Sequence, residues 1–137
     1  MITAIDTNVI SAIISNEPSE ILLAELLGTA LNQGKLVICG AAYAELTAHP
    51  LVGVEGIDFF LSHGQISVDT SCSLEMWLEA GKAYSRYVER RRRASEREPK
   101  RLLMDFIVGA HAFLNADRLL TLDRSRYSRD FPKLRLQ

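Results

Sequence analysis

Short apolar runs and segments with helically spaced apolar residues alternate along the chain. Residues 2–5, 36–39, 65–68 and 119–122 form runs of four residues bounded by polar or turn residues, which predicts buried strands. The intervening segments 9–15, 20–33, 41–47, 54–62, 74–93 and 102–115 carry the spacing of helices, and 134–136 is a candidate fifth strand. Ser19 is placed to cap one of these helices, and either Ser71 or Ser73 to cap the long helix from about residue 74.

This order of elements predicts the fold class. Short, wholly apolar strands joined by helices are typical of a parallel sheet whose two faces are both covered. We therefore expect a three-layer α/β/α fold with a central, mostly parallel sheet of four to five strands. A chain of 137 residues fits one domain, 1–137, and the sequence contains no internal repeat.

The composition is that of an ordinary soluble protein, with 47% hydrophobic and 24% charged residues. No apolar stretch approaches the roughly 20 residues that span a bilayer, and the first residues lack the basic start of a signal peptide. We expect a cytoplasmic protein that does not associate with membranes. Cys39 and Cys72, far apart and without CxxC spacing, are predicted to be buried free thiols.

The net charge of −1 conceals a strong asymmetry. Residues 1–81 contain ten acidic side chains and one basic side chain, whereas residues 82–137 contain seven acidic and fifteen basic ones. The C-terminal part therefore either meets a polyanion or presents a solvated basic helix face.

Four acidic residues occupy positions at which side chains can converge. Asp6 and Asp123 each directly follow a predicted strand, Glu45 lies about one helical turn beyond another, and Asp105 lies in the first turn of its helix. The carboxyl ends of parallel strands share one edge of the sheet, where ligands bind. We expect the four side chains to project toward one point.

Clustered carboxylates repel each other and need a compensating cation or proton. Oxygen ligands without accompanying histidine or cysteine favour Mg²⁺ or Mn²⁺. Such an ion activates water and neutralises charge on a phosphate, so the cluster predicts phosphodiester hydrolysis. Four carboxylates are compatible with one metal ion or with two.

Several motifs resemble those of the PIN-domain ribonucleases, and in particular the VapC-type toxins of toxin–antitoxin pairs. They are Asp-Thr-Asn-Val from Asp6, Ala-Glu-Leu around Glu45, the helix that begins near Asp105, and Thr-Leu-Asp ending at Asp123. The likeness extends from Asp6 to Phe131, and its most specific part is the Asp105 helix followed by Thr121-Leu-Asp123.

The resemblance implies a role for each matching residue. Asp6 and Asp105 would bind the metal directly, Glu45 would act through metal-bound water or as a base, and Asp123 would complete the pocket or hold a second metal. Asn8 and Thr121 would support these acids by hydrogen bonds. The implied activity is endonucleolytic RNA cleavage that leaves a 5′-phosphate and a 3′-hydroxyl, by a homodimer that a cognate antitoxin inhibits.

The resemblance also suggests a use for the basic segment 86–101, which contains Pro99 and is expected to be exposed and mobile at its end. Its cations are candidates for gripping RNA phosphates, with antitoxin docking as the competing use: Arg90, Arg91, Arg92, Arg93, Arg97, Lys100 and Arg101. His111 is predicted to be a packing or hydrogen-bonding residue, Asp130 to be solvated, and Gly109 to permit a close helix approach.

Two other functional classes share part of this pattern. A phosphohydrolase of the haloacid dehalogenase type also places an aspartate after its first strand, but it needs a second aspartate where this chain has Asn8, and a lysine before the last acidic motif. A catalytically inactive PIN-like module that binds RNA or a protein partner is the main alternative, and the presence of all four acids disfavours it.

Overall fold

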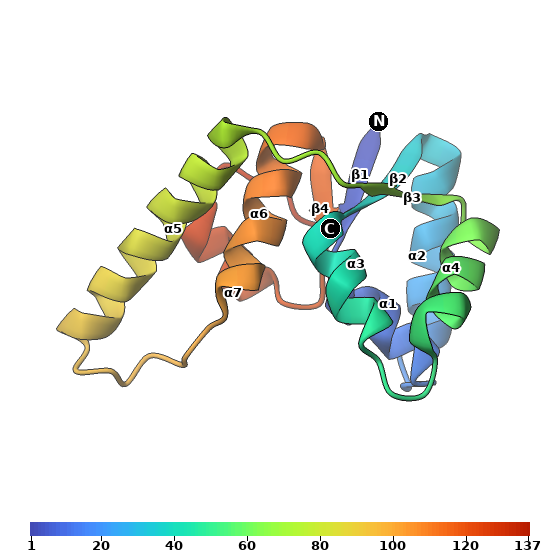
Figure 1. Cartoon of the computed structure of the whole chain (residues 1–137), viewed down its shortest axis with the longest axis horizontal. Helices are drawn as coiled ribbons and strands as arrows, with labels where there is room; N and C mark the ends of the chain where they lie inside the picture. Colours follow the sequence, from blue (N-terminus) through green and yellow to red (C-terminus); the bar gives the residue numbers. More distant parts are fainter.

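The computed structural model describes the whole chain, residues 1–137, around one parallel sheet (Figure 1). Its strands are β1 (Ile2–Ile5), β2 (Lys35–Cys39), β3 (Ile66–Asp69) and β4 (Arg118–Leu120), in the order β3-β2-β1-β4. Ala4 of β1 lies opposite Val37 on one side and Leu119 on the other. The predicted α/β class and the parallel sheet are confirmed.

Helices flank this sheet (Figure 1). They are α1 (Thr7–Ile14), α2 (Glu20–Gln33), α3 (Gly40–Thr47), α4 (Gly53–His63), α5 (Leu74–Arg93), α6 (Leu103–Asn115) and α7 (Arg124–Asp130). The predicted cap Ser73 accepts a hydrogen bond from the backbone N–H of Met76 at 3.1 Å, and α5 begins at the next residue. At Ser19, in contrast, the side chain makes no capping bond.

Two elements near the C-terminus differ from the prediction. Helix α7 was not predicted, because its sequence RSRYSRD is polar and buries only Tyr127 and Asp130, so it shows no apolar stripe. The candidate strand 134–136 is reduced to one bridge between Leu136 and Leu119, next to which the N–H of Leu119 donates to the carbonyl of Arg135 at 2.9 Å.

The long helix α5 packs mainly against α6 and also contacts α7. Helix α6 in turn packs on β1 and β4 (Figure 1). The ring of Phe106 on α6 is fully buried against Tyr84 and Tyr87 of α5, with ring centroids 5.2 and 5.3 Å away. This aromatic contact fixes the start of α6, where Asp105 lies.

The strand order creates a switch point between β1 and β4. From β1 the chain moves outward to β2 and then β3, and it returns to the opposite side of β1 as β4. In open parallel sheets a crevice forms at the carboxyl ends of the strands on either side of such a reversal. Asp6 follows β1, and Asp123 lies shortly after β4, so both acids flank this crevice.

Two further observations bear on the expectations from sequence. None of the helices combines the length and the apolar character needed to cross a membrane. Both cysteines are free thiols, but only Cys39 is buried, where its sulfur accepts a hydrogen bond from the N–H of Ala42. The prediction that Cys72 is buried is wrong, because it lies in the exposed turn between β3 and α5.

Candidate active site

The structure brings the four acidic side chains singled out from the sequence to one pocket of about 330 Å³. We call it the acidic pocket; its lining comprises Asp6, Thr7, Asn8, Ser11, Glu45, Arg101, Asp105, Asp123, Arg126 and Tyr127. Asp6 comes from the end of β1, Glu45 from α3, Asp105 from the first turn of α6, and Asp123 from the residue before α7. Two helices, the residue after β1 and the residue before α7 therefore supply one carboxylate each.

Asp6 is held by a hydroxyl group from the neighbouring strand end. The Oγ1 of Thr121 donates to Oδ2 of Asp6 at 2.7 Å and accepts from the backbone N–H of Asp123 at 3.0 Å. Asn8 donates to the same hydroxyl at 3.3 Å and accepts from the N–H of Leu122 at 3.2 Å. Asn8 and Thr121 thus join the segments that carry Asp6 and Asp123, the positions expected of supporting residues.

Thr7 was not identified from the sequence, yet it links two of the acids. Its hydroxyl oxygen lies 3.0 Å from Oε2 of Glu45 and 3.4 Å from Oδ1 of Asp6, so its single proton favours Glu45. Thr7 is buried, whereas Glu45 is exposed on α3. The only signal in the sequence was its position between Asp6 and Asn8.

The environment of Asp6 disfavours its charged form. Burial raises the pKa of Asp6, which is 6% exposed, and the nearby charge of Asp105 raises it further, while hydrogen bonds from Thr121 and Tyr127 oppose the shift. Burial likewise raises the pKa of Tyr127, so its hydroxyl stays protonated beneath the acids. A cation in the pocket would favour ionised Asp6.

Two arginines already provide positive charge in the acidic pocket. Nη1 of Arg126 lies 2.8 Å from Oδ2 of Asp123, and Nε of Arg101 lies 3.6 Å from Oδ2 of Asp105. Four carboxylates therefore face two guanidinium groups, and a negative excess remains. This excess attracts a further cation.

The chemistry of the lining fits a hard divalent ion. The pocket offers carboxylate, hydroxyl and amide oxygens and no histidine or cysteine, a donor set that suits Mg²⁺ or Mn²⁺. The structure does not, however, assemble three of these carboxylates into a group close enough to hold an ion. Asp105 and Asp123 instead face Arg101 and Arg126, and their assignment as metal ligands stays a prediction.

The basic segment contains two kinds of arginine. Arg90 and Arg101 form ion pairs with Asp130, which is 1% exposed, so the prediction that Asp130 is solvated is wrong. Burial of Asp130 is tolerated because both of its carboxylate oxygens have a guanidinium partner. Arg90 and Arg101 consequently serve to join α5, the loop before α6 and α7.

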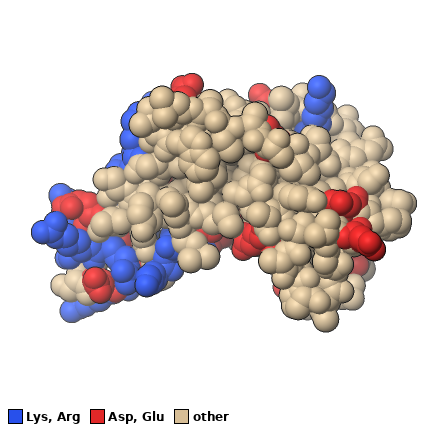
Figure 2. Space-filling model, viewed as in Figure 1, with Lys and Arg blue, Asp and Glu red and all other residues tan.

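The remaining cations of this segment are more open to solvent. Arg91 donates from Nε to the carbonyl of Glu98 at 3.1 Å, and Arg93 pairs with Glu89 on the exposed face of α5. Arg92, Arg97 and Lys100 are exposed. Figure 2 shows the basic side chains gathered at the end of the molecule formed by the last turns of α5 and the following loop, with acidic side chains in the hollow of the lower side. Binding of RNA by this segment, and its mobility, remain predictions.

Two residues outside the pocket behave as expected. His111 is buried, and its Nε2 lies 3.0 Å from Oδ2 of Asp69, which confirms a hydrogen-bonding histidine. Gly109 permits a close approach, because a Cβ there would lie 2.2 Å from the ring of Phe131.

Comparison with known proteins places this geometry in a family. The family model for the PIN domain matches residues 3–132. The fold resembles chains in the structure of VapBC-1 from nontypeable Haemophilus influenzae (TM-score 0.69, 23% identity, covering 100% of this chain and 97% of that one). It also resembles VapBC2 from Rickettsia felis bound to a DNA fragment from its promoter (TM-score 0.69, 21% identity, 100% and 98% coverage).

A search of curated proteins finds no significant match. The two structural likenesses, at these identities, demonstrate a shared fold. The family match spans nearly the entire sequence and includes all four acids of the pocket. The chain belongs to the PIN-domain family.

Proposed function

We propose that this protein is a metal-dependent endoribonuclease and the toxin of a toxin–antitoxin pair. The observation that carries the proposal is the meeting of Asp6, Glu45, Asp105 and Asp123 in one pocket at the switch point of the sheet. Membership of the PIN-domain family supports nuclease chemistry at this place. RNA as the substrate rests on the likeness to VapC-type toxins.

Each acid has a proposed role that its surroundings support. Asp6, Asp105 and Asp123 would hold Mg²⁺ or Mn²⁺, which when bound supplies an activated water and neutralises phosphate charge. Glu45 is the most exposed of the four, and it is suited to accept a proton from the attacking water. Thr7 would orient the Glu45 carboxylate, since its hydroxyl lies 3.0 Å from Oε2.

The proposed partner is a small antitoxin protein. Both similar structures are VapBC complexes, which supports a comparable assembly for this chain. The proposal includes a homodimer and a cytoplasmic location, which follow from the resemblance and from the composition.

The test is cleavage of total RNA by the purified protein. We expect cleavage with Mg²⁺ or Mn²⁺, with 5′-phosphate ends, and none in excess EDTA. Asp105→Asn should lower the rate by two or more orders of magnitude, as expected when a metal-binding carboxylate is lost. Asp58→Asn is the matched control, because Asp58 is exposed on α4 outside the pocket and should leave the rate unchanged.

Cleavage that persists in excess chelator would reject the metal-dependent mechanism. Binding of RNA without any cleavage in Mg²⁺ or Mn²⁺ would instead favour a catalytically inactive PIN-like module.

A further inference from the structure

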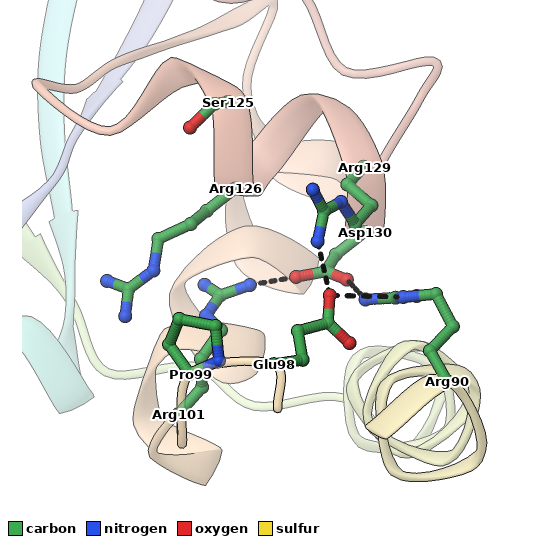
Figure 3. Close-up of a pocket in the computed structure, with 8 residues that line it drawn as sticks. All are labelled: Arg90, Glu98, Pro99, Arg101, Ser125, Arg126, Arg129 and Asp130. Carbon is green, nitrogen blue, oxygen red and sulfur yellow. Dashed lines mark hydrogen bonds and ion pairs between the residues drawn. The ribbon is translucent and has the colours of Figure 1, made fainter. Parts of the chain in front are cut away.

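A second cavity, of about 180 Å³, adjoins the acidic pocket and has the opposite charge. We call it the arginine cavity, because four guanidinium groups line it, from Arg90, Arg101, Arg126 and Arg129 (Figure 3). Glu98 and Asp130 supply the two carboxylates, and no hydrophobic residue takes part. Positive charge therefore exceeds negative charge within it.

The two carboxylates hold part of this arginine set in place. Asp130 pairs with Arg90 at 2.5 Å and with Arg101, and Glu98 pairs with Arg129 and, at 3.7 Å, with Arg90. Figure 3 shows these five side chains as a connected network and Arg126 apart from it. These ion pairs hold Arg90, Arg101 and Arg129 in fixed positions. Arg126 has no ion pair with Glu98 or Asp130.

Two buried N–H donors of the cavity's arginines make no hydrogen bond within the protein. They are the Nε atoms of Arg90 and Arg101, which lie 3.7 Å from a Glu98 oxygen and 3.6 Å from an Asp105 oxygen, beyond hydrogen-bond distance. Buried donors are almost always satisfied, by protein groups, water or a ligand. Neither Nε hydrogen bond is made within the protein, so an oxygen atom that entered the cavity would find unused donors there.

The two cavities share a wall. Arg101 and Arg126 line both of them, and Arg126 also pairs with Asp123 in the acidic pocket at 2.8 Å. A group in the arginine cavity would therefore lie next to a group held by the four acids. In a single strand of RNA, such neighbours are consecutive phosphates of the backbone.

We propose that the arginine cavity binds the RNA phosphate adjacent to the one that is cleaved. The inference rests on the proposed function, which it deepens by naming the site of the neighbouring phosphate. Guanidinium groups pair well with phosphate oxygens, and such contacts position the backbone without reading its sequence. This assigns phosphate binding to Arg126 and Arg129 of α7, which lie outside the basic segment 86–101.

The test measures RNA binding separately from cleavage. A single-stranded RNA with a 5′-hydroxyl end is titrated with protein in EDTA at several salt concentrations, and binding is followed by fluorescence anisotropy. Arg126→Gln and Arg129→Gln should each weaken binding at least threefold and flatten the slope of log affinity against log salt by about 0.7 per lost phosphate contact. The side chains are 41% and 58% exposed, so both variants are expected to fold.

Arg124→Gln is the matched control. Arg124 lies on the same short helix and is exposed, but it lines neither cavity, so its slope should equal that of the wild type. A neutral methylphosphonate at the phosphate next to the cleaved position should weaken wild-type binding and have no further effect in Arg126→Gln. Non-additive losses of this kind identify a direct contact.

Distinct results separate the ways in which the proposal can fail. Equal salt slopes for Arg126→Gln, Arg129→Gln and Arg124→Gln would overturn it, even if the protein cleaves RNA. If inorganic phosphate competes only with 5′-phosphorylated RNA, the cavity binds a terminal phosphate and the proposal is also overturned. Slopes that fall as expected in a protein that never cleaves RNA would support this site and contradict only the proposed nuclease activity.

Discussion

The hydroxyl of Thr121 donates a 2.7 Å hydrogen bond to the Asp6 carboxylate and receives the backbone N–H of Asp123 at 3.0 Å. This one oxygen therefore links the residues that follow β1 and β4. The bond also helps an otherwise unfavourable buried carboxylate, since it lowers the pKa of Asp6 against the larger effect of burial.

Replacement of this hydroxyl should destabilise the fold. In Thr121→Val the Asp6 carboxylate loses its shortest hydrogen bond and the Asp123 N–H loses its acceptor, at a cost of about 1–3 kcal/mol. Urea unfolding measures the loss. Thr121→Ser retains the hydroxyl and should recover most of the stability; equal losses in both variants would show that the methyl group, and not the hydrogen bond, matters.

Removal of the charge at Asp6 should stabilise the metal-free protein. Because burial raises the pKa of Asp6, the folded state holds its proton more tightly than the unfolded state, and the free energy of unfolding falls as pH rises through the interval between the two pKa values. Asp6→Asn does not ionise. In EDTA at neutral pH, the free energy of unfolding of Asp6→Asn should exceed that of the wild type by roughly 0.5–2 kcal/mol.

The advantage of Asp6→Asn should shrink as the pH is lowered through that interval toward about 3.9, the ordinary aspartate value, because the wild-type side chain also becomes neutral. Urea unfolding at a series of pH values follows this difference. An Asp6→Asn protein less stable than the wild type at neutral pH would mean that burial does not dominate the pKa of Asp6.

Loss of the buried carboxylate at Asp130 should be far more damaging than loss of a surface one. Asp130→Asn removes the buried carboxylate that pairs with Arg90 and with the nearly buried Arg101, and leaves Arg101 only its 3.6 Å contact with Asp105. This predicts destabilisation of about 3–5 kcal/mol in urea unfolding. Glu89→Gln, which removes the exposed pair with Arg93, should cost less than about 0.5 kcal/mol. Similar small effects of the two substitutions would contradict a structural role for Asp130.

The elements with strong apolar patterns were predictable from sequence. Helix α5 begins and ends where expected, at residues 74 and 93, because Ser73 caps it and an apolar stripe runs along it. Helix α7 has no such stripe, since it contributes one buried aromatic ring and a buried ion pair. Its existence depends on contacts with distant parts of the chain, which periodicity does not report.

The candidate site divides in a similar way. Asp6 and Asp123 could be placed together because parallel strands end at a common edge, a rule of topology. The contacts of Thr7 and Asp130 could not be predicted in this way, because no rule of topology brings them to their partners. Glu45 lies 38 residues from Thr7 along the chain, and Arg90 lies 40 residues from Asp130. Arginines 90 and 101 appeared to be free cations for the same reason, as their pairing with Asp130 requires a helix that was not predicted.

The central claim is that the acidic pocket binds a hard divalent cation, and titration of the metal-free protein with Mn²⁺ by isothermal calorimetry tests it most directly. We predict saturable binding by the wild type and by the control Asp58→Asn, and loss of that binding in the double variant Asp6→Asn, Asp105→Asn. Binding of Mn²⁺ that is unchanged in the double variant, or absent from the wild type, would contradict the account.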